Sequence, residues 1–229
     1  MIGLKRASYM LLIFALLFVW GPALPGSAAA DSFPETFDVI IDVGHGGVDG
    51  GTSKNGILEK DLNLAIAKKL YAKLQEQSLV VGMTRTHDYA LSDDSPFDHI
   101  KSRHMKDMRQ RKLIADTLNP KLFVSLHINW SKSQKVRGPI VIYQKNDKSY
   151  ALAHLVQYHL NDLYDVKKAP IKGKPYYLMK NLDMPSIIVE AGYISNPNDA
   201  KILTQESTQE EIAAAIAHAI SEYLLLYPL

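Results

Sequence analysis

Short apolar runs recur along the chain and alternate with longer segments that have a helical spacing of apolar residues. The runs are rich in valine and isoleucine, and several are apolar at consecutive positions, which favours strands buried on both faces. They lie at residues 37–42, 79–83, 122–125, 139–143 and 186–189. This pattern predicts a sheet that is covered by helices on both sides.

The longer segments predict the helices. Apolar residues recur every four positions over 62–74, and Asp61 precedes them as a candidate N-cap. Similar stripes occupy 152–163 and 212–224, and a more highly charged helix is expected over 100–117. Strands that alternate with helices predict a single α/β domain with a mostly parallel, twisted sheet and helices on both faces.

The first thirty residues have the features of a secretory signal peptide. Lys5 and Arg6 precede an apolar run over 9–20, and small residues at 26–30 resemble a cleavage site. We therefore expect a signal peptide at 1–30 and a single exported domain at 31–229. The alternative is an uncleaved anchor, and only in that case would the chain be attached to a membrane.

Composition and charge exclude several classes of protein. The chain has 26 basic and 24 acidic residues, and residues 1–30 hold two of the basic ones and no acidic one, so 31–229 is formally neutral. A nucleic-acid-binding domain would normally carry a clustered basic excess, so we expect no nucleic acid partner. The absence of cysteine excludes disulfides, thiolate ligands and a cysteine nucleophile. Any metal site must therefore use His, Asp and Glu.

Polar side chains follow three of the predicted strands at the points where these strands end. They are His45, His127 and Glu190, and Glu59 comes just before the first long helix. The carboxyl ends of parallel strands meet at one edge of a sheet, where α/β proteins bind their ligands. Two imidazoles and one carboxylate suit Zn²⁺, and the remaining carboxylate would then be available as a general base. These residue types do not by themselves decide which glutamate has which role.

A lone histidine or glutamate is seldom a metal ligand. The evidence that these residues are ligands therefore comes from their positions in the sequence. His45 lies among glycines that permit a tight turn, and Glu190 directly follows an apolar strand. The same glycine-rich turn lacks both the G-x-G-x-x-G fingerprint and a P-loop ending, and the chain has no G-x-S-x-G elbow. The other six histidines are weaker candidates: His87, His99 and His104 lie in polar segments, and His154, His159 and His218 lie on helices without a partner acid at clear ligand spacing.

Four motifs together resemble the zinc-dependent N-acetylmuramoyl-L-alanine amidases of the amidase_3 type. They are DVGHGGVDGG at 42–51, LEKDLN at 58–63, SLHIN at 125–129 and VEAGYISNP at 189–197. Thr84-Arg85, Arg109 to Arg111 and the segment 177–185 also match this family. Within the family, the chain is most similar to the germination-specific amidases of spore-forming bacteria. The resemblance extends from about residue 37 to the last predicted helix.

The resemblance implies that His45, Glu59 and His127 bind zinc and that Glu190 is the catalytic carboxylate. The reaction would be hydrolysis of the amide bond between N-acetylmuramic acid and L-alanine in peptidoglycan. The spore role implies action in the cortex, between the spore membranes, in the formation of muramic-δ-lactam. Asn129 and Arg111 are candidate substrate-binding residues, Asp42 and Asp61 are candidate partners of the ligands, and Trp130 could stack on a sugar or belong to the core.

Three alternatives stay open at the level of the sequence. A zinc peptidase with the same site would cleave within the stem peptides, and a general autolysin would act on the vegetative wall. A non-catalytic wall-binding module would be expected to have lost Glu190 or a ligand, and all four residues are present. Because no residues remain for a separate wall-binding domain, targeting is expected to come from the domain itself, from a partner or from confinement between the spore membranes. An activating partner protein is a further candidate.

Overall fold

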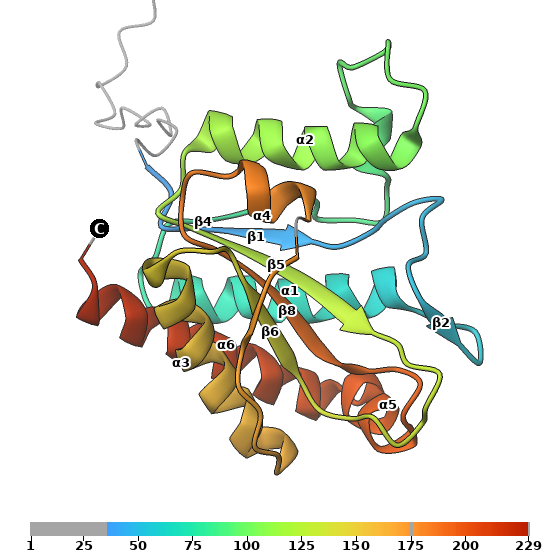
Figure 1. The fold of residues 1–229 in the computed structure, drawn as a ribbon, viewed down its shortest axis with the longest axis vertical. Helices are drawn as coiled ribbons and strands as arrows, with labels where there is room; N and C mark the ends of the chain where they lie inside the picture. Colours follow the sequence, from blue (N-terminus) through green and yellow to red (C-terminus); the bar gives the residue numbers. More distant parts are fainter. Residues whose placement is uncertain (1–35, 175, 229) are drawn as a thin grey trace, which may run out of the picture. The chain divides into compact units, whose positions relative to one another are not determined.

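A six-stranded sheet forms the centre of the computed structural model, which describes residues 36–174 and 176–228. Its strand order is β4-β1-β5-β8-β6-β7 (Figure 1). Neighbouring strands are parallel except β6 and β8, which are antiparallel. The predicted mostly parallel sheet is thus confirmed. The strands are β1 (Val39–Val43), β4 (Val81–Met83), β5 (Leu122–Asn129), β6 (Ile140–Tyr143), β7 (Ile171–Lys172) and β8 (Ser186–Tyr193).

Helices cover both faces of this sheet, as the sequence predicts. In Figure 1, α2 and α4 lie above the sheet, while α1, α3 and α6 lie below it. A small antiparallel hairpin of β2 (Ser53–Lys54) and β3 (Ile57–Leu58) connects β1 to α1. The helices are α1 (Glu59–Glu76), α2 (Arg103–Leu118), α3 (Asp147–Tyr164), α4 (Tyr177–Asn181), α5 (Pro197–Thr204) and α6 (Glu206–Leu226), with a 3₁₀ turn at Leu91–Asp93.

The two faces of the sheet belong to two hydrophobic cores of unequal size. Val39, Ile41 and Val43 of β1 point into the larger core, together with the apolar stripes of α1, α3 and α6. Ile40 points to the opposite face and packs in a smaller core with residues of α2 and α4. Because both faces are buried, these strands read as continuous apolar runs in the sequence. Asp42, the next residue on the side of Ile40, is fully buried under α2.

The structure corrects several predicted boundaries. β5 and β8 continue to Asn129 and Tyr193, so His127 and Glu190 lie inside strands rather than after them. Asp61 does not cap the first helix: α1 begins at Glu59, its N-cap residue is Leu58, and Asp61 is exposed in the first turn. The charged helix begins at Arg103, and the side chain of Ser102 caps it by accepting a hydrogen bond from the Met105 N–H.

The predicted signal peptide and its cleavage site lie outside the described residues. The boundary between 1–30 and 31–229 therefore stays a prediction. Within residues 36–174 and 176–228, no helix combines the length and the apolar character that crossing a membrane requires.

Candidate metal centre

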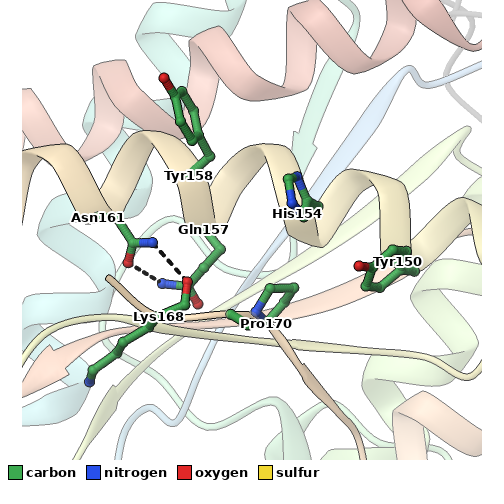
Figure 2. A pocket seen from close by; sticks show the side chains of 8 residues that line it. Tyr150, His154, Gln157, Tyr158, Asn161, Lys168 and Pro170 are labelled. Carbon is green, nitrogen blue, oxygen red and sulfur yellow. Dashed lines mark hydrogen bonds between the residues drawn. The ribbon is translucent and has the colours of Figure 1, made fainter. Parts of the chain in front are cut away.

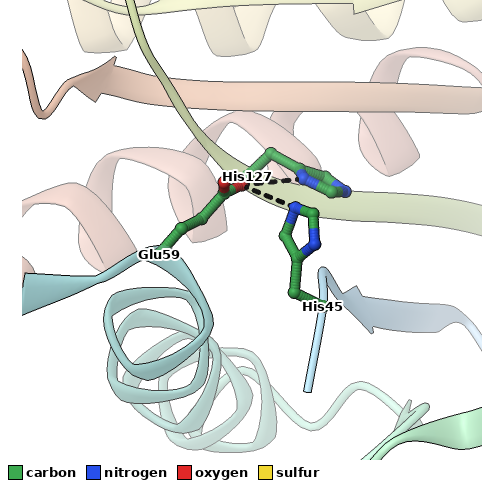
Figure 3. Close-up of side chains that lie close together, drawn as sticks. All are labelled: His45, Glu59 and His127. Atoms are coloured by element: carbon green, nitrogen blue, oxygen red, sulfur yellow. Dashed lines mark hydrogen bonds and ion pairs between the residues drawn. The ribbon is translucent and has the colours of Figure 1, made fainter. Parts of the chain in front are cut away.

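Three side chains from distant parts of the chain meet at the carboxyl edge of the sheet. His45 follows β1, His127 lies in β5 and Glu59 is the first residue of α1. One potential ligand atom from each residue lies within 4.8 Å of the others. Figure 3 shows both imidazole rings turned toward the Glu59 carboxylate. The predicted convergence of these residues is therefore present in the structure.

A single carboxylate oxygen lies between the two imidazoles. Glu59 Oε1 is 3.2 Å from His45 Nε2 and 3.0 Å from His127 Nδ1. The rings are nearly perpendicular, with centroids 5.0 Å apart and an interplanar angle of 81°. Two ligand atoms that each lie about 2.0–2.1 Å from zinc at a tetrahedral angle are about 3.3–3.4 Å apart. The observed spacing thus matches a zinc site after small side-chain movements.

The backbone around Glu59 holds its carboxylate in place. The Thr52 N–H donates to Oε2 at 2.8 Å, and the Ile128 N–H donates to Oε1 at 3.0 Å. Burial by itself would raise the pKa of Glu59, but hydrogen bonds and charge interactions with His127 and His45 outweigh it and hold this pKa well below its usual range. Glu59 is therefore an anionic group that is only 4% exposed and prepared for a cation.

Two glycines leave the space that the ligands occupy. A Cβ added to Gly44 would lie 2.5 Å from Cε1 and 2.7 Å from Nε2 of His127. A Cβ added to Gly51 would lie 2.6 Å from Glu59 Oε2 and 2.7 Å from His45 Cδ2, and Gly51 also has a φ of +65°. The glycine-rich turn is thus needed for close approach between its backbone and the cluster.

The residue that presents the first imidazole has an unusual backbone conformation. His45 has a φ of 60°, in the left-handed region, and Gly46 and Gly47 after it also have positive φ. Its Nδ1 lies 2.9 Å from Asp49 Oδ2, an arrangement that orients a ligating histidine. Burial would lower the pKa of His45, but Glu59 and Asp49 outweigh it and raise the pKa to about 9. Asp49 was not predicted as a site residue; its signals in the sequence are its place in the motif 42–51 and its spacing of four residues from His45.

Two buried arginines hold the carbonyl groups of this turn. Arg85 donates through Nε to the His45 carbonyl at 2.7 Å and through Nη2 to the Gly44 carbonyl at 3.0 Å. Arg111 donates through Nη1 to the Val43 carbonyl at 2.9 Å and through Nη2 to the His45 carbonyl at 3.3 Å. Both side chains are only 1% exposed.

Arg111 is also part of a buried charge network beneath the metal centre. It forms an ion pair with Asp42, which is fully buried, and a second one with Asp107, whose Oδ2 lies 2.6 Å from Nε. Asp42 also accepts hydrogen bonds from Ser125 Oγ at 2.6 Å and Thr84 Oγ1 at 3.0 Å. Burial favours a raised pKa for Asp42, but the charge of Arg111, the hydrogen bonds from Ser125 and Arg111 and the charge of His127 together outweigh it and keep the pKa of this carboxyl low. The prediction that Arg111 binds substrate does not agree with this burial, since its donors are directed to protein acceptors.

Glu190 faces the same edge from the neighbouring strand. In the parallel pairing of β5 and β8, it lies directly opposite His127. Burial raises the pKa of Glu190, and Glu59 adds to this effect, whereas His127 and His45 oppose it. A cavity of about 240 Å³ opens here between the sheet, α2 and α4. Its lining includes His45, His127, Glu190, Asp42, His104 and Tyr176.

Other predicted residues lie elsewhere. Asn129 ends β5, and its side-chain oxygen accepts from the Trp130 N–H at 2.7 Å, so a role in substrate binding stays a prediction. Trp130 is 48% exposed, which rules out its alternative placement in the core. Asp61 is exposed on α1 and is not a member of the cluster.

The fold and this cluster define an α/β protein with a candidate metal site of the type that metallohydrolases use. Residues 39–222 match the family described as N-acetylmuramoyl-L-alanine amidase, Amidase_3. The chain belongs to this family, and it is an amidase of peptidoglycan. The family resemblance carried by the four sequence motifs is thereby confirmed.

Relatives along the whole chain agree with this assignment. The germination-specific N-acetylmuramoyl-L-alanine amidase of Bacillus subtilis is 31% identical over 225 residues, which cover 96% of this chain and 94% of the relative. The structure of the CwlD amidase from Clostridioides difficile, in complex with the GerS lipoprotein, is 32% identical with a TM-score of 0.76. It covers 82% of this chain and 98% of that one. The amidase AmiC2 of Nostoc punctiforme is 33% identical, with a TM-score of 0.67, and covers 82% of this chain and 96% of that one.

Proposed function

We propose that the chain is a zinc-dependent enzyme that hydrolyses the amide bond between N-acetylmuramic acid and L-alanine. His45, Glu59 and His127 are the zinc ligands in this proposal, and Glu190 is the catalytic carboxylate. The observation that carries the proposal is the convergence of the His–Glu–His cluster and Glu190 on one cavity at the edge of the sheet. Three protein ligands leave a position for water or substrate, as catalytic zinc sites require.

The contacts of the two glutamates support this division of roles. Glu59 Oε1 lies between both imidazoles, so this carboxylate is placed to share a cation with them. Glu190 stands on the next strand, opposite His127, and no hydrogen bond or ion pair occupies its side chain among the described residues. Glu190 is thus free to take a proton from water and give it to a leaving amine.

Glu190 transfers one proton in the proposed reaction. Bound zinc would act as a Lewis acid that polarises the scissile carbonyl and makes water more acidic. Glu190 accepts a proton from the water whose oxygen attacks the lactyl carbonyl carbon. As the C–N bond breaks, Glu190 delivers this proton to the nitrogen of L-alanine, which leaves as a free amine. His45, Glu59 and His127 keep their positions throughout.

Replacing the catalytic carboxylate separates chemistry from metal binding. Glu190→Gln should reduce hydrolysis of purified peptidoglycan by at least about a thousandfold, because the amide cannot take up the proton, while the zinc content stays that of the wild type. The matched control is Glu211→Gln, the same change at an exposed position of α6. Unimpaired turnover by Glu190→Gln would exclude the assigned mechanism.

The bond that is cleaved distinguishes the amidase from a peptidase. Denuded peptidoglycan is incubated with the protein, with and without a zinc chelator, and new amino termini are labelled and identified by mass spectrometry. We expect chelator-sensitive release of L-alanine amino termini. Amino termini of later stem-peptide residues would identify a peptidase, and chelator-insensitive release would contradict the zinc proposal.

We further propose that the enzyme acts outside the cytoplasm on spore cortex and works with a partner protein. The full-length similarity to a germination-specific amidase supports the cortex, and a related amidase solved with a lipoprotein supports the partner. Export would depend on the predicted signal peptide at 1–30. Deletion of the gene should remove muramic-δ-lactam from the cortex while vegetative walls stay unchanged. Altered vegetative walls would instead indicate a general autolysin.

A further inference from the structure

A second His–Glu–His cluster lies on the helical layer of the protein. His159 projects from α3, and His218 and Glu222 project from α6, four residues apart and therefore on one face of that helix. Their potential ligand atoms all lie within 4.8 Å of one another. From sequence alone, His159 and His218 had no evident partner acid. For His218 that expectation was wrong, because Glu222 follows four residues later on the same helix, and packing of α3 against α6 brings His159 to the same carboxylate.

The second cluster shares three features with the first: an imidazole–carboxylate contact, a pair of nearly perpendicular imidazole rings and the same donor types. His159 Nε2 lies 3.0 Å from Glu222 Oε2, compared with 3.0 and 3.2 Å for the two imidazoles around Glu59. The rings of His159 and His218 are again nearly perpendicular, with an interplanar angle of 87° and centroids 4.8 Å apart. The 3.0 Å separation approaches the spacing of about 3.3–3.4 Å that two ligands of one tetrahedral zinc ion require. The donor set is also the same, two imidazoles and one carboxylate.

The surroundings of this cluster favour a metal ion over a purely structural pair. Glu222 forms an ion pair with no lysine or arginine in the part of the chain that the structure describes. His218 is exposed, and the side chains of His159 and Glu222 are 21% and 37% exposed, so an ion can enter and water can complete its coordination. Imidazole and carboxylate ligands suit zinc, nickel and copper, in contrast to the all-oxygen sites of calcium and magnesium.

This cluster is separate from the candidate catalytic centre. α3 and α6 cover one face of the sheet, whereas the cavity beside Glu190 lies under α2 and α4 on the other face (Figure 1). It is also separate from a cavity of about 230 Å³ along α3, shown in Figure 2. There Gln157 and Asn161 are already hydrogen-bonded to each other at 2.9 Å, and none of the three cluster residues lines this cavity.

We propose that His159, His218 and Glu222 form a second site for a divalent transition-metal ion, with zinc as the representative ligand. The ion joins α3 to α6 and stabilises the helical layer, because it binds the folded packing and not the unfolded chain. Its occupancy does not depend on the function proposed for the first cluster. The protein would thus have two metal sites with the same donor types, one at the carboxyl edge of the sheet and one between α3 and α6.

The test counts zinc ions bound by purified, tag-free protein. Native mass spectrometry of the metal-free wild type after addition of zinc should show two ions per chain, and His218→Ala should show one. His218 is exposed, so its removal does not disturb the core. His154→Ala, an exposed histidine on α3 outside the cluster, is the matched control and should keep both ions.

Calorimetric titration in a His45→Ala/His127→Ala background isolates the second site. This variant should bind one zinc ion, and adding His218→Ala or Glu222→Gln should weaken that binding at least about tenfold. Peptidoglycan hydrolysis by His218→Ala alone should equal that of the wild type. If the wild type binds one zinc ion and His218→Ala still binds one, the second site is overturned. If the wild type binds one zinc ion and His218→Ala binds none, the second site is supported and the zinc ligands proposed for catalysis are contradicted.

Discussion

Replacing Arg111 by methionine should destabilise the protein in a pH-dependent way. The guanidinium is 1% exposed and is paired with Asp42, which is fully buried. Breaking a buried pair by removing one partner costs about 3–5 kcal/mol, because the other charge is left buried. This is a large part of the free energy of unfolding of a typical domain, about 5–15 kcal/mol. Lys112→Met is the matched control on the same helix, and loss of its exposed pair with Asp116 should cost at most about 1 kcal/mol.

The pH dependence follows from the carboxyl that remains. In the wild type the folded-state pKa of Asp42 is lowered, so its stabilising contribution is present above the unfolded pKa and is lost as pH falls through the folded pKa. Without Arg111, burial dominates and the folded pKa lies above the unfolded one. The folded variant then retains a proton that the unfolded chain has lost, so its stability falls as pH rises above about 4. The difference between wild type and variant must therefore widen from pH 4 toward neutral pH.

Urea unfolding of both proteins from pH 4 to pH 8, with a chelator present, measures this difference without a contribution from bound metal. The gap should increase by at most about 1.4 kcal/mol per pH unit, the limit for one titrating group. A gap below about 1 kcal/mol at neutral pH, or one that is the same at every pH, would refute the assignment of Arg111 as the counter-ion of a buried Asp42. Zinc binding by the variant should also weaken, because Arg111 holds the His45 carbonyl.

Two further changes test the metal centre itself. Gly51→Ala should abolish zinc binding in a folded protein, since its Cβ would lie 2.6 Å from Glu59 Oε2. The control Gly56→Ala adds a Cβ at a similar positive φ with no neighbour within 4 Å, so this variant should keep the metal. Equal zinc content in both variants would contradict the steric argument. Asp49→Asn should weaken zinc binding about 10–100-fold in a chelator competition, because His45 loses the carboxylate that orients it, and an unchanged affinity would show that this contact does not matter.

The fold was predictable because its strands and helices have distinct apolar periods. Runs such as 122–125 and 186–189 are apolar at consecutive positions because both faces of the sheet are covered. The ends of β5 and β8 were not predictable, since His127 and Glu190 are polar residues inside strands, directed at a cavity rather than at a core. Polar residues at such positions indicate a functional site at the edge of the sheet. They also interrupt the apolar pattern, so the end of the strand cannot be predicted from it.

The candidate site was predictable only as far as its residues end predicted strands. His45, His127 and Glu190 met that criterion, whereas Glu59 was a candidate only because it comes just before the first long helix, and the structure brings it within reach of both imidazoles. Arg111 lies in the charged segment 100–117 and was a candidate for substrate binding, and nothing local indicates that its partner is Asp42, 69 positions earlier. The pairing of His159 with Glu222 is likewise a property of helix packing, at a separation of 63 positions.

The turn after β1 shows why these distant partners are needed. The left-handed conformation at His45 directs its imidazole to Glu59 but gives the backbone no regular ladder beyond Val43. Buried carbonyl groups without donors would be costly, and the side chains of Arg85 and Arg111 supply the donors for three successive carbonyls from Val43 to His45. Asp42 then neutralises Arg111. A strained ligand-bearing turn therefore requires a buried ionic network beneath it, and the position of the first imidazole depends on that network as much as on the glycines.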